Sequence, residues 1–340
     1  MKLMLVGPKS PPVGGTTVLF DQLCRYLDAA DGVELTTFNT SPDAIGRSPL
    51  AVLRFLWQVF RGVRRHDVVV LHASSTSMVM IVGLVLRAGA VLFQKPWGFR
   101  NFGGRFPDYW RSHGALPHWL FGHTLLKADQ LFFETRESVA FVQQLTDRPV
   151  DWFPNSRELP EPPPLRDGPA RRFVFISHVK PSKGVGVILQ AADGLDDLTF
   201  DVYGPLEDGM TEADFAGSHV NYGGSLKAED VIPALTSHDV LLLPTFYEGE
   251  GYPGIILEAF AAGVPVITTN WRCIPEITDE QCAILIEPQD PVALREAILA
   301  LANDGPRMNA MRAHALERAR DFCNETWDAF FLEKVRQMRR

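Results

Sequence analysis

Short apolar runs that alternate with helical patterns are the feature that most constrains how this 340-residue chain can fold. The first run, from Lys2 to Val6, is followed by a glycine loop with Gly14 and Gly15 and then by the helical pattern TTVLFDQLCRYL. The unit recurs at DVVVLHASS with the helical pattern MVMIVGLVLRAGAVL, and it continues through KPWGFRNF, ADQLFFETR and VDWFP. Strands that alternate with helices predict a parallel sheet covered on both faces.

A proline cluster, ELPEPPPLRDGPA at residues 158–170, interrupts this alternation, and the same architecture then restarts. The later strand patterns are RFVFISHV, LTFDVYG, HVNYGG, DVLLLPT, VPVITT and CAILIEP. Linkers of this composition commonly separate domains. The sequence therefore predicts an α/β protein with two doubly wound domains that face a central cleft. We expect an N-terminal domain over residues 1–160, a C-terminal domain over 161–320, and a final helix over 321–340 that packs back toward the first domain.

Charge is unevenly distributed between these halves. Residues 1–160 contain 17 Lys and Arg against 13 Asp and Glu, and the remainder contains 16 against 28, which gives formal charges of +4 and −12. A net charge of −8 argues against a nucleic-acid partner, because such proteins usually present a basic face. The four cysteines show no metal-ligand or disulfide spacing, which is typical of a reducing cytoplasm. The two halves are expected to face different partners.

Residues 50–66, LAVLRFLWQVFRGVRRH, contain four arginines and no acidic residue among many apolar ones. On a helix this composition suits contact with an anionic membrane surface, and it equally suits a helix that covers the first sheet. No stretch approaches the roughly 20 apolar residues of a membrane span, and the N-terminal apolar run is too short for a signal peptide. We expect a cytoplasmic protein in which residues 50–66 either contact the inner face of the plasma membrane or pack on the first sheet.

The stretch FYEGEGYPGIILEAFAAGVPVITT, residues 246–269, contains the clearest candidate site. Ligands of open parallel sheets bind beyond the carboxyl ends of the strands, where loop N–H groups and helix dipoles favour an anion such as phosphate. Gly249, Gly251 and Gly254 allow close approach to the backbone, and Glu250 lies among them. Glu258 stands alone on an apolar helix, so we expect a ligand to supply its partner. The alternative is a core helix with a solvated Glu258.

These residues resemble the retaining GT-B glycosyltransferases of family 4, the glycosyl transferases group 1. Glu250 to Glu258 fits the E-x7-E pattern of that family, and VKPSKGVGVILQAA, FDVYGPLEDG and VNYGGSLKAEDVIPAL are similar to it as well. The resemblance implies the GT-B fold and metal-independent transfer with retention from a nucleoside-diphosphate sugar, with no cofactor. Together with the basic segment 50–66 and the more basic first domain, it suggests a saccharide or polyprenol-linked saccharide acceptor, as in bacterial surface polysaccharide assembly.

The resemblance also assigns roles to single residues. Glu250 matches the residue that contacts the transferred sugar, and Lys183 matches the lysine on the diphosphate. A fixed cation there is reasonable, because a departing nucleoside diphosphate gains negative charge. Glu258 matches the residue that binds the ribose hydroxyls of the donor. Gly251 and Tyr252 match positions near the donor sugar and phosphates.

Gly14 and Gly15 resemble the loop of the first domain that faces the donor phosphates. This loop is not G-x-G-x-x-G, so a nicotinamide site is disfavoured. At the donor phosphates the sequence departs from the family once, because His178 occupies the position of a usual arginine. The second cation on the diphosphate is therefore either His178 or Lys180.

A second departure lies in NFGGRFPDYW, where Phe102 precedes Gly103 and Gly104 and many family members have a histidine. These three residues are weak acceptor-side candidates, and Phe102 could instead belong to the core. His72, at the end of DVVVLHASS, points toward the expected cleft and has either a structural or an acceptor-side role. No D-x-D triplet occurs, so no metal site is predicted.

Two other functions remain open at this point. A catalytically silent subunit that binds a nucleotide sugar and needs a partner chain would explain His178 and Phe102. A GT-B sugar-nucleotide epimerase is disfavoured, because the E-x7-E and Lys-Gly signatures belong to the transferase pattern.

Overall fold

The computed structural model describes residues 1–11, 14–74 and 76–339, and the chain divides into two compact units. The first unit comprises residues 1–155 and 325–340, and the second comprises residues 156–324. The second unit begins before the proline cluster because the backbone of Arg157 is hydrogen-bonded to residues at the C-terminal end of that unit. The Arg157 N–H donates to the Phe322 carbonyl at 2.9 Å, and the Asn324 N–H donates to the Arg157 carbonyl at 2.9 Å.

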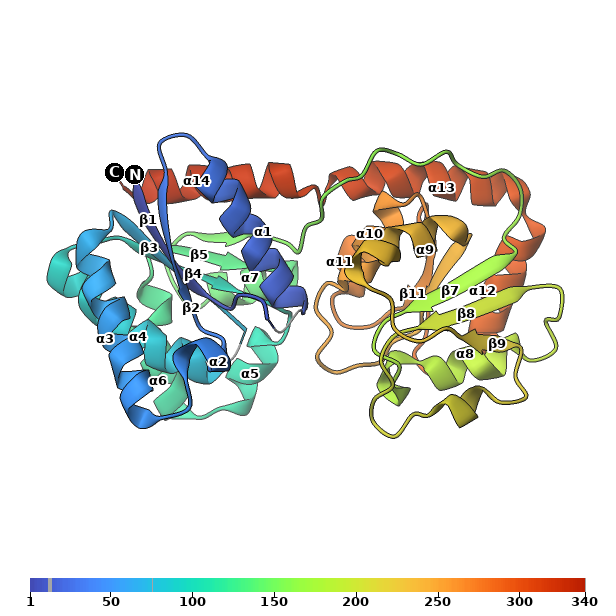
Figure 1. Cartoon of the computed structure of the whole chain (residues 1–340), viewed down its shortest axis with the longest axis horizontal. Helices are drawn as coiled ribbons and strands as arrows, with labels where there is room; N and C mark the ends of the chain where they lie inside the picture. The colour runs from blue at the N-terminus through green and yellow to red at the C-terminus, as the bar shows by residue number, and fades with distance from the viewer. Residues whose placement is uncertain (12–13, 75, 340) are drawn as a thin grey trace. The chain divides into compact units, whose positions relative to one another are not determined.

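The first unit contains a parallel sheet with the strand order β2-β1-β3-β4-β5-β6 (Figure 1). Its strands are β1 (Lys2–Gly7), β2 (Glu34–Asn39), β3 (Val68–Ala73), β4 (Trp97–Asn101), β5 (Gln130–Phe133) and β6 (Val150–Trp152). Strand β2 lies on one side of β1, and β3 and the strands that follow it lie on the other side. The strand order therefore reverses between β1 and β3.

Helices cover both faces of this sheet. One face packs against α1 (Gly15–Ala29) and α14 (Asn324–Met338). The other face packs against α3 (Pro49–Arg65), α4 (Thr76–Phe93), α5 (Phe106–Ser112), α6 (Ala115–His123), the 3-10 turn η1 (Leu125–Lys127) and α7 (Arg136–Gln143), and the short α2 (Pro42–Ile45) precedes α3. The N-terminus of α3 is capped, because Ser48 Oγ accepts the Ala51 N–H at 3.2 Å and Pro49 occupies the first turn.

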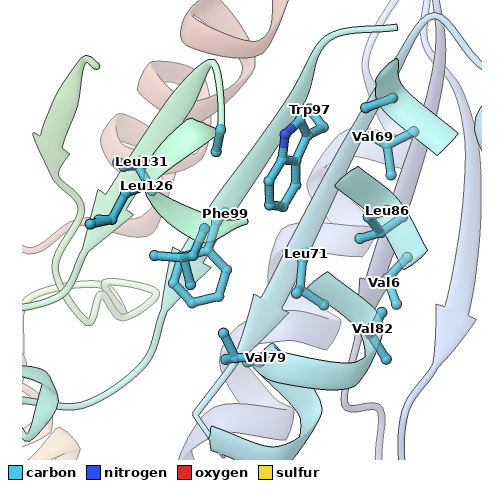
Figure 2. Close-up of a cluster of buried hydrophobic side chains, with 14 of the residues drawn as sticks. Val6, Val69, Leu71, Val79, Val82, Leu86, Trp97, Phe99, Leu126 and Leu131 are labelled. Carbon is cyan, nitrogen blue, oxygen red and sulfur yellow. The ribbon is translucent and has the colours of Figure 1, made fainter. Parts of the chain in front are cut away.

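The core of the first unit follows from the period of two in its strands. Val69 and Leu71 of β3 face α4, whereas Val68 and Val70 face the layer of α1 and α14. Figure 2 shows the first of these clusters, in which Leu71 lies beside side chains of α4. The continuous apolar run of β3 thus reflects a strand that is buried on both faces.

The second unit repeats the architecture with the strand order β12-β11-β10-β7-β8-β9, again all parallel. Its strands are β7 (Arg172–Ile176), β8 (Thr199–Tyr203), β9 (Val220–Tyr222), β10 (Val240–Leu243), β11 (Val266–Thr269) and β12 (Ala283–Ile286). Its helices are α8 (Val185–Ala192), α9 (Val231–Ser237), α10 (Gly254–Ala261), α11 (Ile274–Ile277), α12 (Pro291–Asn303) and α13 (Gly305–Arg320), with 3-10 turns η2 (Pro181–Lys183), η3 (Glu212–Phe215) and η4 (Ala228–Asp230). Here the order reverses between β7 and β10.

The prediction of two doubly wound parallel sheets is confirmed. Among the described residues, none of the helices is both long enough and apolar enough to span a bilayer.

Candidate functional site

The carboxyl ends of β7 and β10 define the candidate site of the second unit. These strands are neighbours in the sheet although β8 and β9 separate them in sequence. Their following loops, residues 177–184 and 244–253, leave the same edge of the sheet and lead into α8 and α10. Ligands of doubly wound sheets bind where the strand order reverses in this way. The sequence-predicted residues Lys183 and Glu250 lie in these two loops.

Lys183 and Glu250 form a buried ion pair at this edge. The Lys183 ammonium donates to both carboxylate oxygens of Glu250, at 3.0 and 2.7 Å, and the Thr245 hydroxyl donates to one of them at 2.7 Å. Lys183 is 9% exposed and Glu250 is 7% exposed. Such burial is tolerated because each charge has a hydrogen-bonded partner. The structure therefore brings together the two residues that the sequence predicts as catalytic.

Gly184 allows the two loops to pack closely against each other. Gly184 has φ +82°, and a Cβ at this position would lie 2.1 Å from the Pro244 carbonyl oxygen. The Phe246 N–H also donates to the Ser182 carbonyl across the two loops at 2.8 Å. Any larger residue after Lys183 would separate the loops, so the Lys-Gly dipeptide has a direct structural reason.

Two lysines approach one aromatic ring beside the ion pair. The Lys180 ammonium lies 4.3 Å from the ring centroid of Tyr247, and the Lys183 ammonium lies 5.1 Å from it. His178 instead places Nδ1 2.6 Å from Glu207, with its own side chain 60% exposed, and this hydrogen bond lowers the pKa of Glu207. Of the two candidates for a second cation, Lys180 is the one that shares a ring with Lys183.

Glu258 has a partner in the protein itself. Its carboxylate accepts the Arg157 Nε–H at 2.6 Å, and the two side chains are 27% and 13% exposed. The expectation that a ligand must supply the missing partner of Glu258 is therefore wrong. Gly254 makes room for the pair, since a Cβ there would lie 1.6 Å from Arg157 Nη2. Sequence reasoning missed Arg157, whose only signal is a basic residue directly before the proline cluster.

The loop between the two glutamates is anchored to the core by Tyr252. This side chain is 3% exposed, its hydroxyl hydrogen-bonds to Glu276, and its ring meets the edge of Phe322 at 6.4 Å. Gly251, directly before it, is half-buried. The buried Tyr252 side chain holds the loop against the core, whereas Gly251 stays partly exposed.

In the first unit, Gly14 and Gly15 stand at the start of α1, in the loop after β1 where the strand order of that sheet reverses. A Cβ at either position would meet no atom within 4 Å. The Gly14 N–H donates to Thr17 Oγ1 at 2.9 Å. Residues 12–13 of this loop lie outside the described residues. Open space at both glycines allows a ligand to approach the backbone.

Phe102 belongs to the core and also borders a cavity. It is 4% exposed, and it lines a cavity of about 410 Å³ beyond the end of β4. Other lining residues include Asn101, Arg105, Asp108, Tyr109 and Phe121. Gly103 has φ +84°, and its N–H donates to Glu134 at 2.8 Å, while Gly104 is buried. Asn101 and Phe102 of the NFGG segment therefore line a cavity with aromatic and polar walls.

His72 does not reach the surface, so the expectation that it points toward the cleft is wrong. It is fully buried, with ring centroids 5.0 Å from Phe20 and 5.5 Å from Phe331, and neither ring nitrogen has a hydrogen-bond partner. Burial, reinforced by the Arg100 charge, holds the pKa of His72 well below its usual 6.5. A neutral core histidine is the result.

Arg100 is a buried cation that sequence reasoning missed. It is 2% exposed, and its guanidinium lies 3.9 Å from the ring centroid of Phe153 and 4.6 Å from that of Phe102. Its Nε and Nη2 have no hydrogen-bond partner, and burial lowers its pKa to about 10. From α14, Asp328 adds a carboxyl whose pKa burial raises to about 7.

One family of known proteins matches part of the second unit. Residues 170–304 match the family described as glycosyl transferases group 1. The Escherichia coli O-antigen chain mannosyltransferase B is 31% identical over 103 residues, which are 30% of this chain and 26% of that protein. The MMP alpha-(1->4)-mannosyltransferase of Mycolicibacterium hassiacum is 32% identical over 154 residues, which are 42% of this chain and 37% of that protein. The matches thus span less than two-fifths of these relatives.

Solved structures resemble the chain over nearly its whole length. Anabaena HepE in complex with UDP gives a TM-score of 0.74 at 16% identity, with coverage of 99% of this chain and 100% of that chain. The lipopolysaccharide outer core galactosyltransferase WaaB in its apo form gives 0.71 at 15%, with coverage of 99% of each. The fold is therefore GT-B, with two Rossmann-like units. Residues 170–304 of the second unit therefore resemble the glycosyl transferases group 1, and the chain as a whole has the GT-B fold.

Proposed function

We propose that this protein is a retaining glycosyltransferase that moves a sugar from a nucleoside-diphosphate sugar to a saccharide or lipid-linked saccharide, in bacterial surface polysaccharide assembly. The observation that carries the proposal is the buried Lys183–Glu250 pair at the point where the strand order of the second sheet reverses. The names of the mannosyltransferase relatives and of the UDP-bound structural neighbour support a nucleotide-sugar donor.

The donor binds along the edge formed by the loops after β7 and β10. Lys183 and Lys180 neutralise the diphosphate, assisted by the N–H groups at the start of α8 and α10. Glu258, held in place by Arg157, accepts hydrogen bonds from the ribose hydroxyls. Glu250 contacts the sugar, and Gly251 lets the donor approach the backbone closely. Gly14 and Gly15 of the first unit, where a Cβ would meet no atom within 4 Å, are further candidates for contact with phosphate.

The chemistry is transfer with retention of configuration at the anomeric carbon. The bond between that carbon and the phosphate oxygen breaks, and a bond to the acceptor oxygen forms on the same face. The departing phosphate oxygen takes the proton of the acceptor hydroxyl. Lys183 stabilises the charge that develops on the diphosphate, and we propose that this charge is met by lysines and N–H groups without a metal ion.

The acceptor saccharide enters the cavity of about 410 Å³ in the first unit. Tyr109 and Phe121 in its wall suit stacking against sugar rings, while Asn101, Arg105 and Asp108 suit hydrogen bonds to hydroxyls. Because the acceptor is proposed to be lipid-linked, the proposal includes a cytoplasmic enzyme that contacts the inner face of the plasma membrane through residues 50–66.

A catalytically silent subunit is the second candidate, favoured by one observation. His178 is bound to Glu207 in solvent and does not add a cation beside Lys183. The two functions differ in turnover by the isolated chain. We expect the purified protein to consume a nucleotide sugar with an acceptor and no partner protein, and NMR of the product to show the anomeric configuration of the donor. An inverted product would contradict retention, and turnover only with a partner would favour the silent subunit.

A further inference from the structure

Helix α4 carries apolar side chains on its solvent side as well as on its core side. Figure 2 shows the core side, where Val82 and Leu86 lie near β3. The solvent side carries Ile81, Leu84, Val91 and Leu92, whose exposures range from 44% to 65%. The sequence of α4 contains one charged residue, Arg87. A helix that is hydrophobic all round is normally covered on all sides, so the outer side of α4 indicates a surface that binds something.

The exposed side of α4 continues onto α3. The ring of Trp57 stacks on Phe60 with centroids 5.8 Å apart, and Phe60 lies 5.3 Å from Phe93 at the end of α4. Both helices cover the same face of the sheet. We call the combined surface the apolar face, and it consists of Leu50, Leu53 and Trp57 of α3 and Ile81, Leu84, Val91 and Leu92 of α4.

Positive charge borders the apolar face without acidic compensation. The sequences of α3 and α4 contain no Asp or Glu. The exposed arginines of α3 are Arg54, Arg61, Arg64 and Arg65, and among the described residues none of them forms an ion pair. The carboxylate that shares a groove with Arg61 and Arg65 is Glu34, which lies 3.6 Å from the Lys2 ammonium. These arginines are therefore available to an external anion.

We propose that the apolar face docks on the surface of an anionic lipid bilayer, with α4 as well as α3 lying in the interface. Apolar side chains would enter the acyl boundary, Trp57 would lie at the headgroup level, and the arginines would meet lipid phosphates. A second copy fits this face less well. A two-fold contact would set each row of arginines against the same row of the other copy.

Docking through α4 places the membrane on the helical layer that also borders the acceptor cavity. Val79 in the first turns of α4 and Phe121 in α6 both line that cavity. A lipid-linked saccharide could extend from the bilayer into the cavity without leaving this layer. This consequence rests on the proposed function, whereas binding to lipid does not.

Flotation with vesicles tests the proposal directly. The full chain is mixed with phosphatidylcholine vesicles with and without phosphatidylglycerol, as wild type and as Leu84→Asp/Val91→Asp. The control is Val292→Asp/Leu299→Asp, two exposed apolar residues with the same spacing on α12 of the second unit. We expect the wild type and the control to float with the anionic vesicles. The α4 variant should bind about tenfold or more weakly, since it loses two apolar side chains that the bilayer would bury.

Three results would overturn the proposal. The wild type could fail to float with anionic vesicles at low salt, or the α4 variant could float as well as the wild type. Sedimentation could also show a dimer that the α4 variant dissociates while vesicles bind neither protein, which would assign the face to a second copy. Nucleotide-sugar binding without vesicles, measured on the same proteins, reports separately on the proposed function, and denaturant unfolding shows that the α4 variant is folded.

Discussion

The two units share one architecture but differ in how their buried cations are paired. In the second unit Lys183 and Arg157 are each paired with a glutamate, at 2.7 and 2.6 Å, beside the edge where the strand order reverses. In the first unit Arg100 lies among aromatic rings, with two guanidinium nitrogens that have no hydrogen-bond partner. The same sheet topology thus carries paired charges at the carboxyl edge of the second unit and a cation among aromatic rings in the first unit.

The difference arises from what covers each sheet. Helix α14 is contributed by the end of the chain, and it places Phe331 and Asp328 over His72 and Arg100 of the first sheet. The second unit leaves its polar loops at the carboxyl edge, close to the surface. The second unit therefore carries the edge at which we propose that a charged donor binds, while the first unit offers an aromatic cavity and an apolar outer face. A parallel doubly wound sheet alone does not determine function; the side chains at its edge do.

Replacement of Lys183 should have the largest effect. Lys183→Met leaves Glu250 buried without its cation, which should destabilise the second unit by about 3–5 kcal/mol. Turnover of the nucleotide sugar should fall by about 100-fold or more, because the diphosphate loses its fixed cation. Denaturant unfolding and initial rates measure the two effects. Lys183→Met with Glu250→Gln should recover stability but not turnover, and recovery of both would contradict the proposed role of Lys183.

Replacement of Asp328 should change how the stability of the first unit depends on pH. Burial raises the pKa of Asp328 to about 7 despite the opposing charges of Arg100 and Arg25, so the folded chain holds a proton that the unfolded chain releases above about pH 4. This contribution is fully present below about pH 4 and is lost as pH rises to about 7.

Asp328→Asn cannot ionise, so its stability relative to the wild type should increase by on the order of 2–4 kcal/mol between pH 4 and pH 8. Denaturant unfolding at several pH values measures this difference. Asp43→Asn, at an exposed position in the same unit, serves as the control. A difference between Asp328→Asn and the wild type that does not change with pH would contradict the burial of an ionisable carboxyl at α14.

The two candidates for the second cation can be separated by comparing Lys180→Ala with His178→Ala. Lys180 lies against the Tyr247 ring beside Lys183 and 3.8 Å from Glu207, whereas His178 is hydrogen-bonded to Glu207 and does not lie against that ring. We expect Lys180→Ala to weaken nucleoside diphosphate binding by about tenfold, as for one lost charge-assisted hydrogen bond, and His178→Ala to change it little. Calorimetric titration gives both affinities. The reverse ranking would assign the role to His178.

Replacement of Arg100 should have the smallest effect and sharpens the contrast with Lys183. Arg100→Met removes a buried cation from between Phe102 and Phe153 without removing a hydrogen bond of its Nε or Nη2. The desolvation penalty of the Arg100 charge, which lowers its pKa, offsets the attraction of Glu134 and Asp328. We therefore expect a change in unfolding free energy below about 1 kcal/mol. A loss as large as that of Lys183→Met would show that the attraction of the two carboxyls outweighs the desolvation penalty.

Sequence reasoning recovered the features that depend on local pattern. Apolar runs located the buried strands, the glycine-rich loop before Glu258 located Glu250, and the resemblance to the glycosyltransferase family located Lys183. It overlooked β2, since ELTTFN mixes polar and half-exposed residues and has no apolar run. It also missed Arg157, whose partner Glu258 lies 101 residues away, and Arg100, whose charge acts on Asp328 only because α14 joins the first unit. Pairings between distant segments leave no periodic signal in a single sequence.

The central claim is that the polar edge of the second unit binds the nucleotide of a sugar donor. Calorimetric titration of a panel of nucleoside diphosphates and their sugars into the wild type, Glu258→Ala and Glu248→Ala tests it most directly. Glu248, an exposed glutamate of the loop that precedes α10, serves as the control. The account predicts selective binding of one nucleotide, weakened by about 1–3 kcal/mol in Glu258→Ala and unchanged in Glu248→Ala. An absence of binding, or an equal affinity of folded Glu258→Ala, would contradict it.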